Sequence, residues 1–251
     1  MTHYAILGGG RLARHMGHYL SLLDQPWSGW ARDPGSPLNT YDISDTGKRL
    51  EAAIQPASHV LILVSDQAIM PVVKKFPFLH GKILVHCAGA ISLPGIAGAH
   101  PLMTFADDLY SLAEYQRIPF MVESGYKLGE LFPGLPNPSY PIGVDQKAFY
   151  HALCVMAGNF PQLLWLEVAD NMSRTLNLPA EVLHPFLGKI LENFRRAPNA
   201  ALTGPLVRGD LQTINRNLGA LEGNPLQKLY LGFVELYESA GSAADLEEHV
   251  S

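Results

Sequence analysis

The sequence predicts a doubly wound, mainly parallel α/β domain followed by an all-helical domain. Three observations predict this fold class. An apolar strand near the start of the chain runs directly into three glycines, short apolar segments then alternate with helical or loop segments, and beyond a proline-rich stretch every periodic segment has helical spacing. The proline-rich stretch covers residues 127–141, so we expect domains at residues 1–141 and 142–251.

The first strand, residues 4–7, is followed by the sequence GGGRLA at residues 8–13 and then by apolar residues at helical spacing. Such a strand–turn–helix junction brings backbone N–H groups close to a dinucleotide pyrophosphate, because glycine has no side chain to keep the phosphate away. We expect Gly8 to form the tight turn, Gly10 to face the pyrophosphate and Ala13 to let the helix lie near the sheet. The cofactor-binding residues predicted here are Gly8, Gly9, Gly10, Arg11 and Leu12.

The remaining predicted strands are short segments rich in Val, Ile and Leu, as expected where helices cover both faces of a parallel sheet. They are residues 28–31, 59–64, 82–86, 99–102 and 118–122. In the second domain, apolar stripes predict helices over residues 146–165, 179–196, 210–221 and 224–241. Pro161 should bend the first of these helices.

The composition narrows the class of protein and of partner. The 251 residues carry a net charge of −5, and no run of Lys or Arg exceeds two residues, so we expect neither nucleic acid nor an anionic membrane surface as a partner. Wholly apolar stretches are too short to span a bilayer, and we expect no signal peptide, because the residues before the first strand offer neither a charged region nor room for an apolar one. Cys87 and Cys154 match no disulfide framework or metal-binding spacing. We therefore expect a cytoplasmic protein without a bound metal.

The end of the second predicted strand bears on the choice of cofactor. In NAD-binding domains an acidic residue at this place binds the ribose hydroxyls, whereas a nearby arginine accommodates the 2′-phosphate of NADP. Arg32 lies where its planar guanidinium could bind that phosphate. Asp33 would favour NAD, but it precedes Pro34 and is typical of a turn. The sequence favours NADP over NAD, with a solvated loop charge as the alternative for Arg32.

Polar side chains follow three further predicted strands, at the edge where ligands of open α/β sheets bind. Ser65 and Asp66 follow one strand, where a helix N-cap is the more common role, although their backbone could border the cofactor. His86 precedes small residues that leave room for a nicotinamide or a substrate, and His100 and Thr104 share a loop stiffened by a proline. A single histidine at a strand end is usually structural, but two at such ends raise the expectation that one is functional.

Five motifs together resemble one family of proteins. They are GGGRLA at 8–13, HCAG at 86–89, HPLMTF at 100–105, the pair Gly158-Asn159, and ALTGPLVRGD at 201–210. The family is that of Rossmann-like NAD(P)-binding proteins with an uncharacterised, 6-phosphogluconate dehydrogenase-like helical C-terminal domain, relatives of ketopantoate reductase and pyrroline-carboxylate reductase. The resemblance covers nearly the whole chain. It implies an N-terminal NAD(P) domain, a helical domain that tends to dimerise, and a substrate cleft between the two.

One position departs from these relatives. In ketopantoate reductase and the hydroxyacid dehydrogenases, the first helix of the second domain presents a catalytic Lys one turn before an Asn. Asn159 matches that Asn, but Val155 stands where the Lys is expected, and His151 lies one further turn back on the same face. A proton donor is still needed, because hydride delivery to a carbonyl or imine leaves negative charge or a basic nitrogen. The proton would come from a histidine or through a hydroxyl, the candidates being His86, His100, His151, Thr104 and Thr203.

The loop over residues 203–210 completes the predicted site. Arg208 could bind a substrate carboxylate with two hydrogen bonds and Thr203 could add another, while the more common role for Asp210 is a helix N-cap. The sequence therefore predicts an NADP-dependent oxidoreductase that reduces or oxidises a small carboxylate-bearing carbonyl, hydroxyl or imine compound, and the resemblance implies a homodimer. Its predicted site residues are His86, His100 and Asn159 for catalysis and Thr104, Thr203 and Arg208 for substrate binding. The missing Lys leaves a non-catalytic NADP-binding sensor or partner protein as the alternative.

Overall fold

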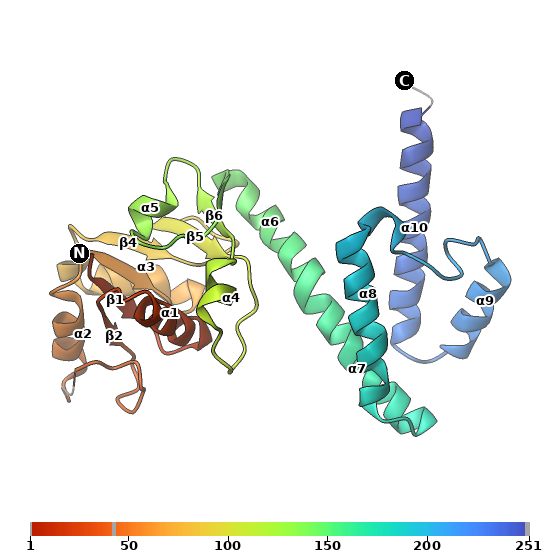
Figure 1. Cartoon of the computed structure of the whole chain (residues 1–251), viewed down its shortest axis with the longest axis horizontal. Coiled ribbons are helices and arrows are strands. Elements are labelled where there is room, and N and C mark those ends of the chain that lie inside the picture. Colours follow the sequence, from red (N-terminus) through yellow and green to blue (C-terminus); the bar gives the residue numbers. More distant parts are fainter. Residues whose placement is uncertain (1, 42–43, 249–251) are drawn as a thin grey trace. The chain divides into compact units, whose positions relative to one another are not determined.

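The computed structural model of the protein describes residues 2–41 and 44–248, with side chains described as far as residue 239. The described chain divides into two compact units, and the division falls between Trp165 and Leu166. The first unit is a sheet with helices, and the second consists of helices (Figure 1).

The first unit holds, within the described residues, a seven-stranded sheet in the order β2-β1-β3-β4-β5-β6-β7 (Figure 1). All neighbouring strands are parallel except β5 and β6. The strands are β1 (Tyr4–Leu7), β2 (Trp27–Trp30), β3 (His59–Ile62), β4 (Ile83–His86), β5 (Ala97–Pro101), β6 (Phe120–Glu123) and β7 (Ser139–Ile142). This topology confirms the predicted doubly wound, mainly parallel sheet.

Two hydrophobic clusters, one on each face of the sheet, hold the helices against it. Along β1, Tyr4 and Ile6 belong to one cluster and Ala5 and Leu7 to the other, as the alternation of side chains along a strand requires. The first cluster includes side chains of α1, α4 and α5, and the second includes side chains of α2 and α3. The bounds of these helices are α1 (Arg11–Leu22), α2 (Thr46–Ile54), α3 (Asp66–Lys75), α4 (Leu112–Gln116) and α5 (Leu128–Leu131). Because strands β1 to β5 are parallel to one another, their carboxyl ends all lie at the same edge of the sheet.

Strand β7 lies at the end of the proline-rich stretch that the sequence predicted to be irregular, so this part of the prediction is wrong. Pro141 pairs in register with Val122 of β6. A strand at the edge of a sheet tolerates proline, because its outer N–H groups need no partner strand. Three of the four β7 residues are exposed, as expected at an edge.

One long helical stretch leads from the first unit into the second. It consists of α6 (Lys147–Cys154), a π-helical turn (Val155–Asn159) and α7 (Phe160–Leu176). Pro161 is the second residue after this turn and lacks the N–H of a regular helix, so the irregularity expected at Pro161 takes the form of π geometry in the turn before it. Because the helix runs on without a loop, the compact units divide within α7 and not at the predicted limit after residue 141.

In the part of the chain that the structure describes, the second unit contains the rest of α7 and three further α-helices, α8 (His184–Arg196), α9 (Leu211–Ala220) and α10 (Leu226–Glu248). The predicted all-helical C-terminal region is therefore confirmed. Among the described residues, Val144–Leu176 is the one helical stretch whose length and composition would allow it to cross a membrane. A helix inside a folded protein can have the same length and composition, and Lys147 in this stretch is buried in an ion pair, so composition by itself assigns no membrane here.

Candidate functional site

The glycine turn places exposed backbone at the N-terminus of α1. Gly8 has a φ of 149°, and a Cβ there would overlap the carbonyl oxygen of Leu63, so glycine is required where the turn passes the end of β3. Gly10 is the N-cap of α1, brings no side chain to cap it, and a Cβ there would meet no atom within 4 Å. Ala13 is fully buried, as its predicted packing role requires. With no acidic residue in its first turn, the N-terminus of α1 favours an anion.

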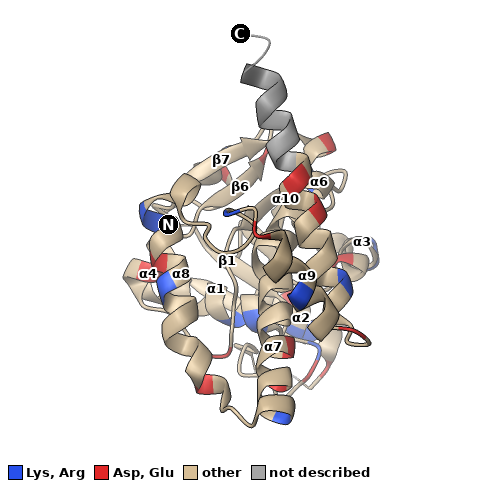
Figure 2. Cartoon of the chain, turned by 90° about the vertical axis from the view of Figure 1, so that its right-hand side faces the viewer, with Lys and Arg blue, Asp and Glu red and all other residues tan. Residues whose placement is uncertain are grey.

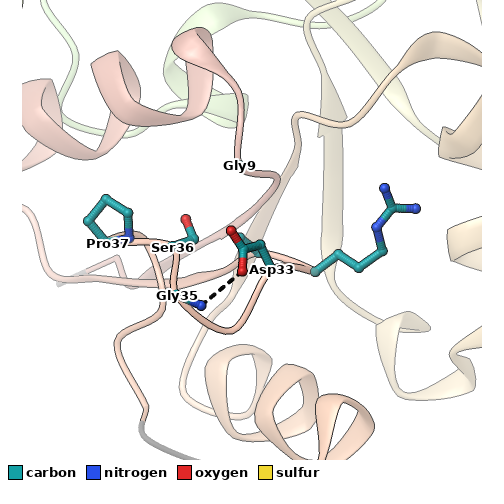
Figure 3. A pocket seen from close by; sticks show the side chains of 7 residues that line it. Gly9, Asp33, Gly35, Ser36 and Pro37 are labelled. Atoms are coloured by element: carbon teal, nitrogen blue, oxygen red, sulfur yellow. Dashed lines mark hydrogen bonds between the residues drawn. The ribbon is translucent and has the colours of Figure 1, made fainter.

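A cavity of about 410 Å³ adjoins this turn (Figure 3). Its walls combine one residue of the glycine turn with residues that follow β2, namely Gly9, Ala31, Arg32, Asp33, Gly35, Ser36 and Pro37. The carboxylate of Asp33 accepts a hydrogen bond from the N–H of Gly35 at 3.0 Å, which agrees with the predicted turn (Figure 3). Arg32 is exposed and has no ion-pair or hydrogen-bond partner among the residues whose side chains are described. The guanidinium of Arg32 can thus bind an anion at the cavity, while one oxygen of the Asp33 carboxylate already accepts a hydrogen bond from Gly35.

The other predicted cofactor residues take up different positions. Arg11 forms an exposed ion pair with Asp107, with Nε and Oδ1 3.0 Å apart, and Leu12 packs against the hydrophobic core. Ser65 is the N-cap of α3 but makes no side-chain cap bond, and Asp66 is the first residue of that helix. Because β3 pairs with β1, the backbone of Ser65 and Asp66 follows the strand beside the glycine turn.

Two histidines meet beside Gly89, near the carboxyl ends of β4 and β5. A Cβ on Gly89 would overlap the ring of His151 and would lie 3.2 Å from Nε2 of His100, so glycine leaves the space that the two rings occupy. The centroids of the two rings are 5.9 Å apart. The hydroxyl of Tyr150 is hydrogen-bonded to Nδ1 of His100 at 2.8 Å. The structure thus brings the predicted His100 and His151 together with a tyrosine that the sequence did not single out.

The surroundings of His100 keep its ring neutral. Burial lowers the pKa of His100 to about 4, and the neighbouring His151 and Lys147 act in the same direction. Burial also raises the pKa of the Tyr150 hydroxyl, so this group keeps its proton. When Tyr150 donates to Nδ1, the single ring proton of His100 lies on Nε2, the nitrogen beside Gly89; in the other tautomer Nδ1 donates to the Tyr150 oxygen and Nε2 is an acceptor.

His86, also a predicted catalytic residue, is fully buried at the end of β4. Its Nδ1 accepts the N–H of Ala88 at 3.2 Å, and its Nε2 lies 3.9 Å from Oε1 of Glu123. Burial is the main reason that the pKa of His86 is lowered to about 4, and the charge of Lys147 adds to the effect. A fully buried imidazole does not present a nitrogen to a substrate, so His86 and His100 differ in the role that each can take.

The structure adds a buried ion pair that the sequence analysis missed. Nζ of Lys147, at the start of α6, donates a hydrogen bond to Oε1 of Glu123, at the end of β6, over 2.6 Å, and both side chains are almost fully buried. Lys147 lies one turn before His151 and two turns before Val155, a spacing that could have identified it. Glu123 offers no such signal, because its partner lies 24 residues away in the sequence.

The predicted substrate-binding residues, and Asn159 predicted for catalysis, are distributed over both units. Thr104 is exposed in the loop after β5, and Asn159 is exposed at the end of the π-helical turn. Thr203 and Arg208 are exposed in the second unit, and their approach to the site stays a prediction. Asp210 is the N-cap of α9 and accepts a backbone N–H of the first turn at 3.0 Å, which confirms its predicted capping role.

Comparisons with known proteins agree with this architecture. Residues 121–236 match the family model of a domain of unknown function, DUF2520. The match begins in β6 and extends through the helical region into α10. Among curated proteins, no sequence matches the chain.

Solved structures resemble the chain over nearly its whole length. A Bacteroides fragilis protein, provisionally named as an NADP oxidoreductase, is 21% identical with a TM-score of 0.74, and the match covers 95% of this chain and 98% of that one. The imine reductase from Myxococcus stipitatus in complex with NADP⁺ is 16% identical with a TM-score of 0.60, covering 97% and 95%. Pyrroline carboxylate reductase from Plasmodium falciparum, with NADP bound, is 12% identical with a TM-score of 0.58, covering 97% and 99%. These likenesses confirm the predicted resemblance in fold, a Rossmann-like domain followed by a helical domain.

Proposed function

We propose that the protein is an NAD(P)-dependent oxidoreductase, with NADP favoured, that transfers a hydride to or from a small carboxylate-bearing carbonyl, hydroxyl or imine compound. One observation carries the proposal: the glycine turn after β1, the cavity lined by Arg32 after β2 and His100 in β5 all lie toward the carboxyl ends of the parallel strands β1 to β5. Ligands of open α/β sheets bind on this side, where the strand order reverses, here between β1 and β3. Structures of the same fold with NADP⁺ or NADP bound support the class of cofactor.

The residues at the glycine turn fit a dinucleotide phosphate. The uncapped N-terminus of α1 offers backbone N–H groups to a pyrophosphate, and Gly10 adds no side chain in front of them. Arg32 would bind the 2′-phosphate, with the hydroxyl of Ser36 in the same cavity. One carboxylate oxygen of Asp33, which would favour NAD, accepts a hydrogen bond within its own turn. When bound, the cofactor supplies the hydride, and the chain holds the cofactor and moves the proton.

His100 is the residue that we propose for proton transfer. Its Nε2 lies beside Gly89, and its Nδ1 is hydrogen-bonded to Tyr150. The neutral ring can donate the Nε2 proton to an atom that gains negative charge, while Tyr150 donates toward Nδ1. His86 has a similarly lowered pKa but is fully buried, so we assign it no contact with substrate.

Substrate binding is proposed for residues of both units. Asn159 would orient the substrate, and Thr104 would border it from the loop after β5. The guanidinium of Arg208 would bind the substrate carboxylate through two parallel hydrogen bonds, with a further one from Thr203. These four assignments follow from the residue types and the resemblance of their motifs.

Assays on the purified protein test the proposal. Calorimetry would measure the affinities for NADPH and NADH, and nicotinamide absorbance would then be followed with a panel of 2-keto acids and cyclic imines. We expect tighter binding of NADPH and turnover of at least one class of compound. NADPH binding without any turnover would contradict the proposed oxidoreductase activity and support a non-catalytic NADP-binding sensor or partner protein. The presence of Val155 where a Lys is expected favours that alternative. If neither nucleotide binds, both candidates fail.

The second unit leaves much apolar surface uncovered, and we propose that a second copy of the chain covers it. Its buried hydrophobic residues, among those described, are Leu183, Ile214 and Val234, too few for an independent core. Large apolar side chains are exposed on its helices, among them Leu166 at 69% and Phe186 at 62%. The ribbons of α7, α8, α9 and α10 are mostly free of Lys, Arg, Asp and Glu (Figure 2). Apolar exposure of this extent marks an interaction surface.

A second copy suits this surface because obligate homodimer interfaces are large and apolar, like a domain core cut in half. Light scattering after size exclusion should give the mass of a dimer, with no monomer on dilution to micromolar concentrations. A monomer that stays folded at those concentrations would contradict the proposal. A requirement for detergent to keep the protein dispersed would point instead to a membrane.

A further inference from the structure

We propose that Lys147 and Glu123 are positioning residues of the proposed oxidoreductase site: their buried ion pair joins the first turn of α6 to β5 and β6 and so holds Tyr150 and His151 against His100. The inference rests on the function proposed above for its biological meaning. The contacts that carry it lie entirely within the first unit.

The sheet fixes the position of Glu123. Strand β5 begins beside the end of β4, where Gly98 pairs with His86, and the antiparallel β6 brings Glu123 opposite Gly98. The N–H of Gly98 donates to Oε2 of Glu123 at 3.1 Å. A Cβ on Gly98 would overlap this carboxylate and would lie 2.6 Å from Nζ of Lys147. Glycine therefore makes room for the ion pair on the backbone of β5, two residues before His100.

The helix completes the contact. Lys147 is the first residue of α6, and its ammonium group reaches the carboxylate of Glu123 across 2.6 Å. Tyr150 and His151 follow within the next turn, one hydrogen-bonded to His100 and the other in ring contact with it. The first turn of α6 thus contacts β5 and β6, and the buried ion pair between Lys147 and Glu123 attaches it to the sheet.

The charges do more than attach the helix. A buried ion pair adds little net stability, because the cost of desolvating two charges offsets their attraction, and a well-packed apolar pair could attach the helix as well. The Lys147 cation also lowers the pKa of both His86 and His100, in addition to the larger effect of burial. Glu123 and Asp66 act in the opposite direction on His86. Lys147 therefore favours neutral imidazoles beside the site.

The double variant Lys147→Met with Glu123→Gln tests this role. It removes both charges at nearly constant volume and leaves no unpaired charge inside, so it should fold. Histidine titrations by NMR report protonation without any substrate, and the variants His86→Asn and His100→Asn assign the two resonances. The titratable or charged groups around the two rings are Lys147, Tyr150, His151, Glu123, Cys87 and Asp66.

We expect the double variant to raise the pKa of His100 and to change its Nδ1 chemical shift, because the Tyr150 contact is no longer held. Each unit of upward shift raises the protonated fraction at mildly acidic pH about tenfold. Lys82→Met is the matched control, because Lys82 is partly buried and donates to the backbone carbonyl of Ala57, away from the site. The control should leave both titrations unchanged.

An unchanged titration and Nδ1 shift of His100 in the folded double variant would overturn the proposal. A measurement on the unaltered protein covers the case of a variant that does not fold: His86 and His100 should stay neutral at mildly acidic pH, and ordinary titration of both would overturn the proposal as well. If the unaltered protein turns over substrate but the titration of His100 is the same in the double variant, the positioning role is refuted and the proposed function stands. If the double variant shifts the titration of His100 but the unaltered protein shows no turnover, the positioning role of Lys147 and Glu123 is supported and the proposed function is refuted.

Discussion

Alanine at Gly8 and alanine at Gly10 should affect different properties. Gly8→Ala should lower stability, and Gly10→Ala should lower the affinity for NADPH. At Gly8 the φ of 149° disfavours any residue with a side chain, and the new methyl group would overlap the carbonyl of Leu63. Backbone strain of this kind costs about 1–3 kcal/mol, and overpacking adds about 1–3 kcal/mol. Gly8→Ala should therefore lower the free energy of unfolding by roughly 2–6 kcal/mol. A protein of this size loses about 2–4 °C in Tm for each kcal/mol.

Gly10→Ala provides the matched comparison. Gly10 has a φ of −82°, and a Cβ added there would meet no atom within 4 Å. The free energy of unfolding of Gly10→Ala should therefore differ from that of the unaltered protein by no more than about 0.5 kcal/mol. The new methyl group would stand where the pyrophosphate approaches, and we expect NADPH affinity to fall at least about tenfold, or about 1.4 kcal/mol. Thermal unfolding and calorimetry with NADPH measure the two effects. Full NADPH binding by Gly10→Ala, or unchanged stability of Gly8→Ala, would refute the reasoning.

Three further outcomes are expected. Arg32→Ala should weaken NADPH binding about 10–100-fold by removing a charge-assisted contact and leave NADH binding unchanged, and equal losses in calorimetry would exclude a 2′-phosphate contact. His100→Asn should lower kcat about 10²–10⁴-fold with NADPH affinity retained, and an unchanged kcat in steady-state assays would assign the proton to another group. The folded pKa values of His86 and His100, about 4, lie below the ordinary 6.5. The unfolded chain therefore binds more protons, so this contribution to stability is complete above about pH 6.5 and is lost as the pH falls toward about 4. Denaturant unfolding across this range should show the decline, and His100→Asn should make it shallower; the same slope in both proteins would contradict the lowered pKa.

The glycine turn and the alternation of strands could be predicted because their signals are local. The spacing of glycines after a strand and the run of apolar residues follow directly from backbone geometry at adjacent positions. Strand β7 escaped prediction because prolines normally indicate a loop, whereas the edge of a sheet tolerates them. The position of β7 at that edge depends on the order of all seven strands.

The candidate site could be predicted only in part. His86 and His100 both read as strand-end histidines, and their different burial depends on the start of β5 beside the end of β4. Glu123 could not be identified, because its contact with Lys147 joins a strand to a helix 24 residues on. Long-range contacts of this kind leave no periodic pattern in the sequence.

Hydrogen exchange with and without saturating NADPH tests most directly that a dinucleotide binds at the glycine turn and the Arg32 cavity. The first turn of α1 and the loop after β2 should bind it together, since Gly9 and Arg32 line one cavity. We expect NADPH to slow exchange in peptides covering residues 8–14 and 31–37, and to leave the β7 peptide at residues 139–142 unchanged. Protection confined to other segments, or no protection in either peptide, would contradict the assignment.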